Sequence, residues 1–251
     1  MTAAFDEPAA IDINEARGHT LTSLLLEMKS DVAITSGLDA GCGFGYFANL
    51  LCQEGLDVSG FDGRPENVAE AARRYPKVKF AVRNVEDPRL VDLGRFDFVS
   101  CFGLLYHLEN PMLAIRNIAA LTAKVLVMES VIVPSDMPMA RLYEEDTDVD
   151  QGLTYVALIP SESFFVKALY LAGMNHVYRA LPLPDHPDFR FHVGKKRRRT
   201  LLVASRVPIR ASLERIAEPP TRQHLWDVLP GLESRGLRAA LRAVRDLRRR
   251  S

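Results

Sequence analysis

A glycine-rich segment is the part of the sequence best suited to hold a ligand. Residues 38–45 read Leu-Asp-Ala-Gly-Cys-Gly-Phe-Gly, between an apolar run predicted as a strand over 34–40 and a helix predicted over about 45–54. Glycines let the main chain turn sharply and let a ligand approach it closely, and the free N–H groups at the start of a helix favour an anionic group. Asp62 ends the next predicted strand, 57–62, where its carboxylate can accept hydrogen bonds from two ribose hydroxyls. Together these residues predict a nucleoside-type cofactor at the carboxyl ends of the first two strands.

The spacing after the glycines separates two classes of cofactor. A dinucleotide-binding loop needs a further glycine three residues after the second one. Tyr46 occupies that position, and its ring would crowd a pyrophosphate. The pattern D-x-G-x-G-x-G, which starts at Asp39, instead resembles the first motif of the class I S-adenosylmethionine-dependent methyltransferases.

Further segments resemble this family in the family's own order. Residues 84–87 (Asn-Val-Glu-Asp) follow the third predicted strand, where the family contacts the adenine amine, and residues 96–99 and 103–108 resemble its fourth strand and the loop after it. The resemblance covers roughly residues 13–205 and implies a seven-stranded, mostly parallel sheet with an antiparallel last strand, and S-adenosyl-L-methionine as cofactor. The cofactor-binding residues that it implies are Asp39, Gly41, Gly43, Tyr46, Asp62, Gly63, Arg64, Asn84, Val85, Glu86, Phe102 and Tyr106.

Two of these residues have alternative roles. Asp39, just before the glycines, is placed either to pair with the cofactor's ammonium group or to hold a water there. Arg64 either covers the adenine or caps the helix that follows it, and the sequence does not separate the two.

His107 is the candidate catalytic base. Methyl transfer to a hydroxyl needs a group that takes the proton as the new bond forms, and a histidine with a reference pKa of about 6.5 suits that task. His107 follows the fourth predicted strand, beside the expected position of the methyl group. The alternative is that it only packs or hydrogen-bonds within its loop.

Acidic residues around a predicted lid, about 134–160, form a second group of candidates. They could assist His107, bind Mg²⁺ through oxygen ligands, accept hydrogen bonds from a polyol, or form a solvated surface. We assign catalysis to His107, Glu129 and Glu144, and acceptor binding to Asn14, Arg17, Tyr106, Glu145 and His192. The candidate ligands of a Mg²⁺ ion are Glu144 and Asp146.

The order of predicted elements indicates the fold that positions these residues. An amphipathic helix over 14–29 precedes alternating strands and helices, which is typical of a doubly wound α/β domain with a parallel sheet covered on both faces. We expect one methyltransferase domain over 1–205, with the lid as an insertion. Residues 206–251 are expected to form a basic helical appendage.

Charge and composition limit the kinds of partner that the chain is expected to bind. The chain has 32 basic and 32 acidic residues in 251, but residues 206–251 hold 11 arginines against five acids, which leaves the body at −6. A nucleic-acid partner is therefore not expected, and the apolar runs are too short to span a bilayer. Three cysteines without CxxC spacing and the absence of a secretory signal predict a soluble cytoplasmic protein. The C-terminal segment 233–250 has an apolar stripe among arginines, which suits a docking helix, a homodimer contact or an anionic surface, but the leading interpretation is a partly frayed surface helix.

The acceptor is the least determined feature. Residues 103–111 and the helix at 14–17 resemble bacterial O-methyltransferases that modify sugars or secondary metabolites, so a hydroxyl of a small-molecule or oligosaccharide acceptor is the leading hypothesis. Residues 104–107 (Leu-Leu-Tyr-His) also resemble tRNA-modifying methyltransferases. A non-catalytic regulatory protein that binds the cofactor is the third alternative.

Overall fold

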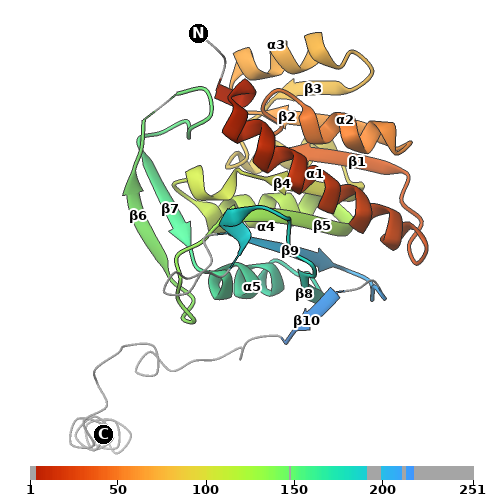
Figure 1. Cartoon of the computed structure of the whole chain (residues 1–251), viewed down its shortest axis with the longest axis vertical. Helices are drawn as coiled ribbons and strands as arrows, with labels where there is room; N and C mark the ends of the chain where they lie inside the picture. The colour runs from red at the N-terminus through yellow and green to blue at the C-terminus, as the bar shows by residue number, and fades with distance from the viewer. Residues whose placement is uncertain (1–3, 147, 191–198, 211–212, 218–251) are drawn as a thin grey trace, which may run out of the picture. The chain divides into compact units, whose positions relative to one another are not determined.

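Within residues 4–146, 148–190, 199–210 and 213–217, which the computed structural model describes, an eight-stranded sheet forms the centre of the protein (Figure 1). Its strand order is β3-β2-β1-β4-β5-β9-β8-β10. Neighbours among β1 to β5 pair in parallel, whereas β9 runs antiparallel to β5 and β8, and β10 runs antiparallel to β8. The strands are β1 (Ser36–Ala40), β2 (Asp57–Asp62), β3 (Lys79–Val82), β4 (Phe96–Phe102), β5 (Thr122–Val131), β8 (His176–Ala180), β9 (Arg199–Ser205) and β10 (Leu213–Ile216).

Helices cover both faces of this sheet, which confirms the predicted doubly wound architecture. The longer helices are α1 (Pro8–Lys29), α2 (Tyr46–Gln53), α3 (Pro65–Arg74), α4 (Pro111–Leu121) and α5 (Glu162–Leu171). The short 3₁₀ helices are η1 (Ala4–Asp6), η2 (Pro88–Leu93), η3 (Leu105–His107) and η4 (Pro187–Phe189).

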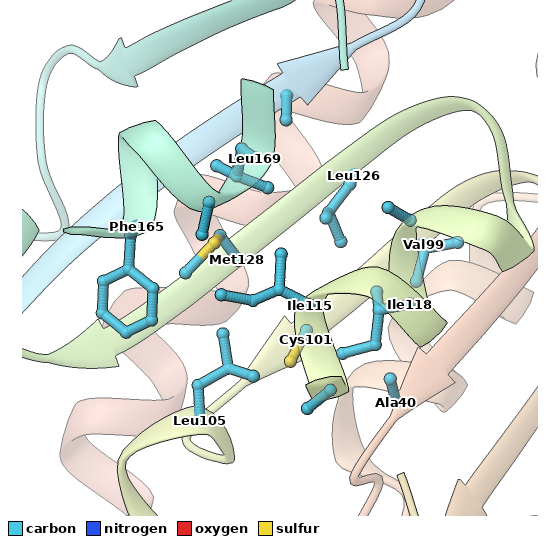
Figure 2. Close-up of a cluster of buried hydrophobic side chains, with 14 of the residues drawn as sticks. Ala40, Val99, Cys101, Leu105, Ile115, Ile118, Leu126, Met128, Phe165 and Leu169 are labelled. Carbon is cyan, nitrogen blue, oxygen red and sulfur yellow. The ribbon is translucent and has the colours of Figure 1, made fainter. Parts of the chain in front are cut away.

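Two hydrophobic clusters lie on opposite faces of the sheet. Successive side chains of a strand point to opposite faces, so Phe98 and Phe102 of β4 pack in the cluster under α1 and α2, whereas Val99 and Cys101 pack in the cluster under α4 and α5. Figure 2 shows the second cluster, in which Ile115 and other apolar side chains of the two helices lie over β4 and β5. The clusters hold the strand ends in place, and the site described below is built on those ends.

Local signals in the sequence account for several helix ends. Ser161 caps α5 because its hydroxyl accepts a hydrogen bond from Phe164 N at 3.2 Å, and Gly173, with φ of 85°, follows the end of that helix. Asn110 is the N-cap residue of α4, although its side chain makes no capping hydrogen bond. None of the helices in the described ranges combines the length and the apolar character needed to cross a membrane.

The sheet differs from the prediction at one edge. The eighth strand, β10, comes from the segment predicted as a helical appendage, and the rest of that segment, 218–251, lies outside the described residues. β10 is only four residues long and carries charges, as exposed edge strands commonly do, so its pattern gave no strand signal. An ion pair between Glu214 and Arg179 of β8, at 2.6 Å, joins it to its neighbour.

The segment 134–160, predicted as a lid, contains a separate antiparallel hairpin. Its strands are β6 (Ala140–Glu144) and β7 (Val156–Pro160), seen at the left of Figure 1. Leu158 N donates to Leu108 O at 2.8 Å, which ties β7 to the loop after η3. The hairpin therefore stands beside the carboxyl end of β4.

Candidate functional site

A cavity of about 770 Å³ lies at the carboxyl ends of the parallel strands. Its wall runs from the glycine loop through Asp62 to η3 and the hairpin, and includes Gly43, Tyr106, His107 and Glu145. β1 lies between β2 and β4 in the sheet. The chain adds β2 and β3 on one side of β1 and then returns past β1 to add β4 and β5 on the other side, so the strand order reverses at β1. Such a switch in strand order is where doubly wound sheets bind ligands.

The glycine loop connects β1 to α2 in a shape that other residues adopt with difficulty. Gly41, Gly43 and Gly45 have φ of 74°, 49° and 85°, in the left-handed region. A Cβ at Gly43 would also lie 3.0 Å from the ring of Phe5, which covers the loop. The loop is held by Gly43 N, which donates to Asp62 Oδ2 at 3.0 Å. The main chain of the glycine loop and the carboxylate of Asp62 are thus fixed next to each other.

Asp62 also binds the start of α3. Its Oδ1 accepts hydrogen bonds from Arg64 N at 2.9 Å and from Asn67 Nδ2 at 3.2 Å. A carboxylate offers about four acceptor positions, so three protein bonds leave capacity for a ligand hydroxyl. Most residues predicted to bind the cofactor line the same cavity: Gly41, Gly43, Tyr46, Asp62, Gly63, Arg64, Asn84, Val85, Phe102 and Tyr106.

Two residues predicted to bind the cofactor lie elsewhere. Asp39 is 1% exposed, and its carboxylate accepts hydrogen bonds from Ser100 Oγ at 2.9 Å and Ala48 N at 3.0 Å. Burial raises its pKa to about 7. Asp39 therefore joins α2 to the sheet, and its predicted role, pairing with the cofactor's ammonium group or holding a water there, stays a prediction. The Glu86 carboxylate accepts a hydrogen bond from Asn110 N, outside the cavity wall, and its predicted contact with the cofactor also stays a prediction.

His107 and Glu145 form a hydrogen-bonded pair in the cavity wall. His107 Nδ1 lies 2.8 Å from Glu145 Oε2, and the two side chains are 12% and 4% exposed. Burial lowers the pKa of His107, while the carboxylate of Glu145 opposes that change. A neutral ring that donates from Nδ1 to the carboxylate has its lone pair on Nε2. The pair can therefore accept a proton at Nε2.

Glu144, predicted to take part in catalysis, lies apart from this pair. Glu144 ends β6 with an exposed side chain outside the cavity wall, whereas Glu145, predicted only to bind the acceptor, contacts His107. Side chains alternate along an extended chain, so two adjacent glutamates point in opposite directions. The alternation would have separated them had the hairpin been recognised.

A buried ionic cluster lies beneath the part of the cavity wall that Arg17, Tyr106 and Arg199 form. Glu129 is 0% exposed and pairs with Arg17 Nη2 at 2.9 Å and Arg199 Nη1 at 3.0 Å. Arg199 also lies over the ring of Tyr106, with 5.3 Å from its guanidinium carbon to the ring centre. Glu129 itself does not line the cavity; it holds the two arginines, and its predicted catalytic role stays a prediction.

Two of the residues predicted to bind the acceptor lie in the cavity wall next to each other. Asn14 and Arg17 line the cavity and bind each other, Arg17 Nη1 donating to Asn14 Oδ1 at 2.9 Å. Arg199 is not among the predicted residues, because it ends the basic run 195–199 and a run of like charges is typical of a solvated surface. His192 lies outside the described residues.

The predicted magnesium site finds no support. Asp146 is exposed, and no group of three or more histidine, cysteine or acidic side chains in the described part of the chain could hold a metal ion.

Comparison with known proteins gives consistent matches. A family model described as "Methyltransferase domain" matches residues 13–163. The ubiquinone biosynthesis O-methyltransferase of Vibrio parahaemolyticus is 35% identical over 89 residues, which are 34% of this chain and only 37% of that protein. This chain therefore matches little more than a third of the relative's length.

Solved structures share the fold at low sequence identity. The N-terminal domain of EvdMO1 with SAH bound superposes with a TM-score of 0.61 and 20% identity, covering 77% of this chain and 80% of that one. CalS10 of Micromonospora echinaspora, described as an amino pentose methyltransferase with SAM bound, has a TM-score of 0.54 and 20% identity over 78% of this chain and 91% of its own.

Proposed function

The chain belongs to the class I S-adenosylmethionine-dependent methyltransferases, and from this premise we propose that it methylates a hydroxyl of a small, carbohydrate-like acceptor with His107 as the general base. The family match covers more than half of the chain, and the sheet has the family's mostly parallel topology. The observation that carries the proposal is the His107–Glu145 pair, which shares one cavity with the glycine loop and Asp62.

The cofactor is S-adenosylmethionine, and the residues around the glycine loop fit it. Gly41 and Gly43 present bare main chain to the cavity, and Asp62 has acceptor capacity left for a ribose hydroxyl. Asn84 and Val85 line the part of the wall that follows β3. When bound, S-adenosylmethionine supplies an electrophilic methyl group on a positively charged sulfur.

His107 provides the proton chemistry in this proposal. Its Nε2 accepts the proton of the acceptor hydroxyl while the oxygen attacks, and Glu145 stabilises the positive charge that develops on the ring. Glu145 also fixes the tautomer, because Nδ1 must donate to it. The buried ring has a lowered pKa and is therefore neutral, and ready to act as a base, at neutral pH.

The polar wall of the cavity supports a polyhydroxylated acceptor. Asn14, Arg17, Tyr106 and Asp188 line it and offer both hydrogen-bond donors and acceptors. The names of the relatives agree with parts of this proposal, since one is an O-methyltransferase and another is described as acting on an amino pentose.

Methyl transfer from radiolabelled S-adenosylmethionine tests the proposal. Monosaccharides, oligosaccharides, catechols and tRNA are offered as acceptors to the wild type and to His107→Ala. We expect a sugar or related polyol to be methylated on oxygen, and His107→Ala to lower kcat by about 10²–10⁴-fold. His19→Ala, which removes an exposed histidine of α1, is the control. Near wild-type turnover in His107→Ala refutes the base, and exclusive labelling of tRNA refutes the acceptor class.

A further inference from the structure

A chain of hydrogen bonds runs from the cofactor side of the cavity to the His107–Glu145 pair. The side-chain amide of Asn67, on α3, donates to Asp62 Oδ1 at 3.2 Å and also to Val149 O at 3.0 Å. One amide group therefore joins the carboxylate at the end of β2 to the segment 148–153, which lies between the hairpin strands.

Arg64 makes a second connection between the same two regions. Its main-chain N–H donates to Asp62 Oδ1, and its Nη2 donates to Gly152 O at 2.7 Å. Gly152 N in turn donates to Glu145 Oε1 at 2.8 Å, and the other oxygen of Glu145 lies 2.8 Å from His107 Nδ1. Each step from Asp62 to the imidazole ring is thus a direct contact.

These polar contacts carry much of what holds the segment 148–153 in place. Asp148, Asp150 and Leu153 are exposed, so the segment buries little apolar surface. Asn67, by contrast, is 2% exposed, and its Oδ1 is buried without a hydrogen-bond partner among the described residues. A buried amide that is not fully satisfied costs stability, which argues that its contacts serve the site.

The close approach of the segment to the base depends on Gly152. A Cβ there would collide with the main-chain oxygen of His107 and would lie 2.6 Å from Glu145 Oε1. The segment therefore contacts both members of the pair.

We propose that Asn67 and Arg64 are positioning residues that couple occupation of the Asp62 site to the placement of Glu145 against His107. A nucleoside hydroxyl bound at Asp62 fixes the carboxylate, and with it both donors that reach the segment 148–153. The catalytic consequence rests on the proposed role of His107, but the coupling itself is a binding property and does not require it. By thermodynamic reciprocity, anything that orders the segment also raises affinity for the cofactor.

Hydrogen–deuterium exchange on the full chain tests the coupling without any acceptor. S-adenosylhomocysteine is added at saturation to the wild type, Asn67→Ala and Arg64→Ala, with affinities measured by calorimetry. We expect the cofactor product to slow exchange in peptides covering 148–155 of the wild type, and this protection to fall by about tenfold in each variant. Arg73→Ala is the matched control, because Arg73 lies on the same helix with an exposed side chain paired to Glu70.

The outcomes separate the coupling from the proposed function. Equal protection of 148–155 in the wild type and in saturated Asn67→Ala overturns the coupling, as does a wild type without protection. Active His107→Ala together with the expected protection pattern overturns only the base. In an active enzyme, Asn67→Ala should lower kcat more than it raises the KM of the acceptor, and a change confined to KM contradicts a positioning role.

Discussion

Replacement of Glu145 by glutamine tests the catalytic pair most directly. Glutamine keeps an oxygen for Gly152 N, so the segment 148–153 retains that contact. At the other end, however, an NH₂ group replaces the oxygen that now lies 2.8 Å from His107 Nδ1. Nδ1 must then accept a hydrogen bond, which places the ring proton on Nε2, where a base needs its lone pair.

The size of the effect follows from the contact that is lost. A hydrogen bond to a charged group contributes about 1.5–3 kcal/mol, and the carboxylate makes this contribution mainly when the ring becomes positively charged. At about 1.4 kcal/mol per tenfold change, we expect kcat to fall by about 10- to 150-fold. The affinity for S-adenosylhomocysteine should change by less than about twofold, because glutamine keeps the oxygen that binds Gly152 N and so leaves the segment 148–153 in contact with Arg64 and Asn67.

The pH profile gives a second readout with a defined sign. Activity of a base rises with pH as His107 loses its proton, and Glu145 raises the pKa of His107 against the effect of burial. Removing the carboxylate therefore lowers that pKa further, and the acidic limb of kcat should move to lower pH.

Radiolabelled methyl transfer measured as a function of pH is the assay, and Glu144→Gln is its control, since the adjacent carboxylate is exposed outside the cavity. A limb that moves to higher pH, or an equal loss of activity in Glu144→Gln, would refute the reasoning.

Two further substitutions test the buried ionic cluster around Glu129 and the glycine loop. Glu129→Gln leaves two guanidinium groups without their buried carboxylate, so the free energy of unfolding should fall by about 3–5 kcal/mol in urea titrations. Glu214→Gln, which breaks an exposed ion pair, should lower it by less than about 1 kcal/mol. Similar losses in the two variants would contradict the role of the buried ionic cluster. Gly43→Ala forces a Cβ to within 3.0 Å of Phe5 and should weaken S-adenosylhomocysteine binding by about tenfold in calorimetry. Gly55 also has a positive φ, but a Cβ added there would have no atom within 4 Å, so Gly55→Ala should leave S-adenosylhomocysteine binding unchanged. Equal effects at both positions would exclude the steric explanation.

The fold could be predicted from the sequence where pattern and period agree. Strand β2 begins and ends at the predicted residues, and strand β4 begins at Phe96, where the resemblance places the fourth strand, because each alternates with a helix and is bounded by turn or polar residues. The short edge strand β10 could not be predicted, since four residues with charged side chains carry no period. Helix α1 begins at Pro8, six residues before the predicted start, because its first turns lack a continuous apolar stripe.

The residues of the site also divide into those that could be predicted from the sequence and those that could not. Motif residues such as Gly43 and Asp62 could be placed because the carboxyl ends of adjacent strands meet at one edge. The partner of His107 could not be chosen between Glu144 and Glu145, because that choice depends on the direction of a hairpin strand. Arg199 was missed for a related reason: one residue of a basic run turns inward only because β9 pairs with β5 and brings it to Glu129.

This difference between the residues on strand ends and those of the hairpin also has a functional meaning. The cofactor groups stand on strand ends that two hydrophobic clusters hold rigidly, and such positions tolerate little change. Glu145 and the segment 148–153 come from outside the sheet and are held mostly by hydrogen bonds to Asn67 and Arg64. A substitution in the hairpin can therefore reshape the acceptor side without disturbing the glycine loop, provided that these contacts are kept. If the proposed function is correct, the hairpin is the part of the molecule in which acceptor specificity can vary while the methyl-donor site stays the same.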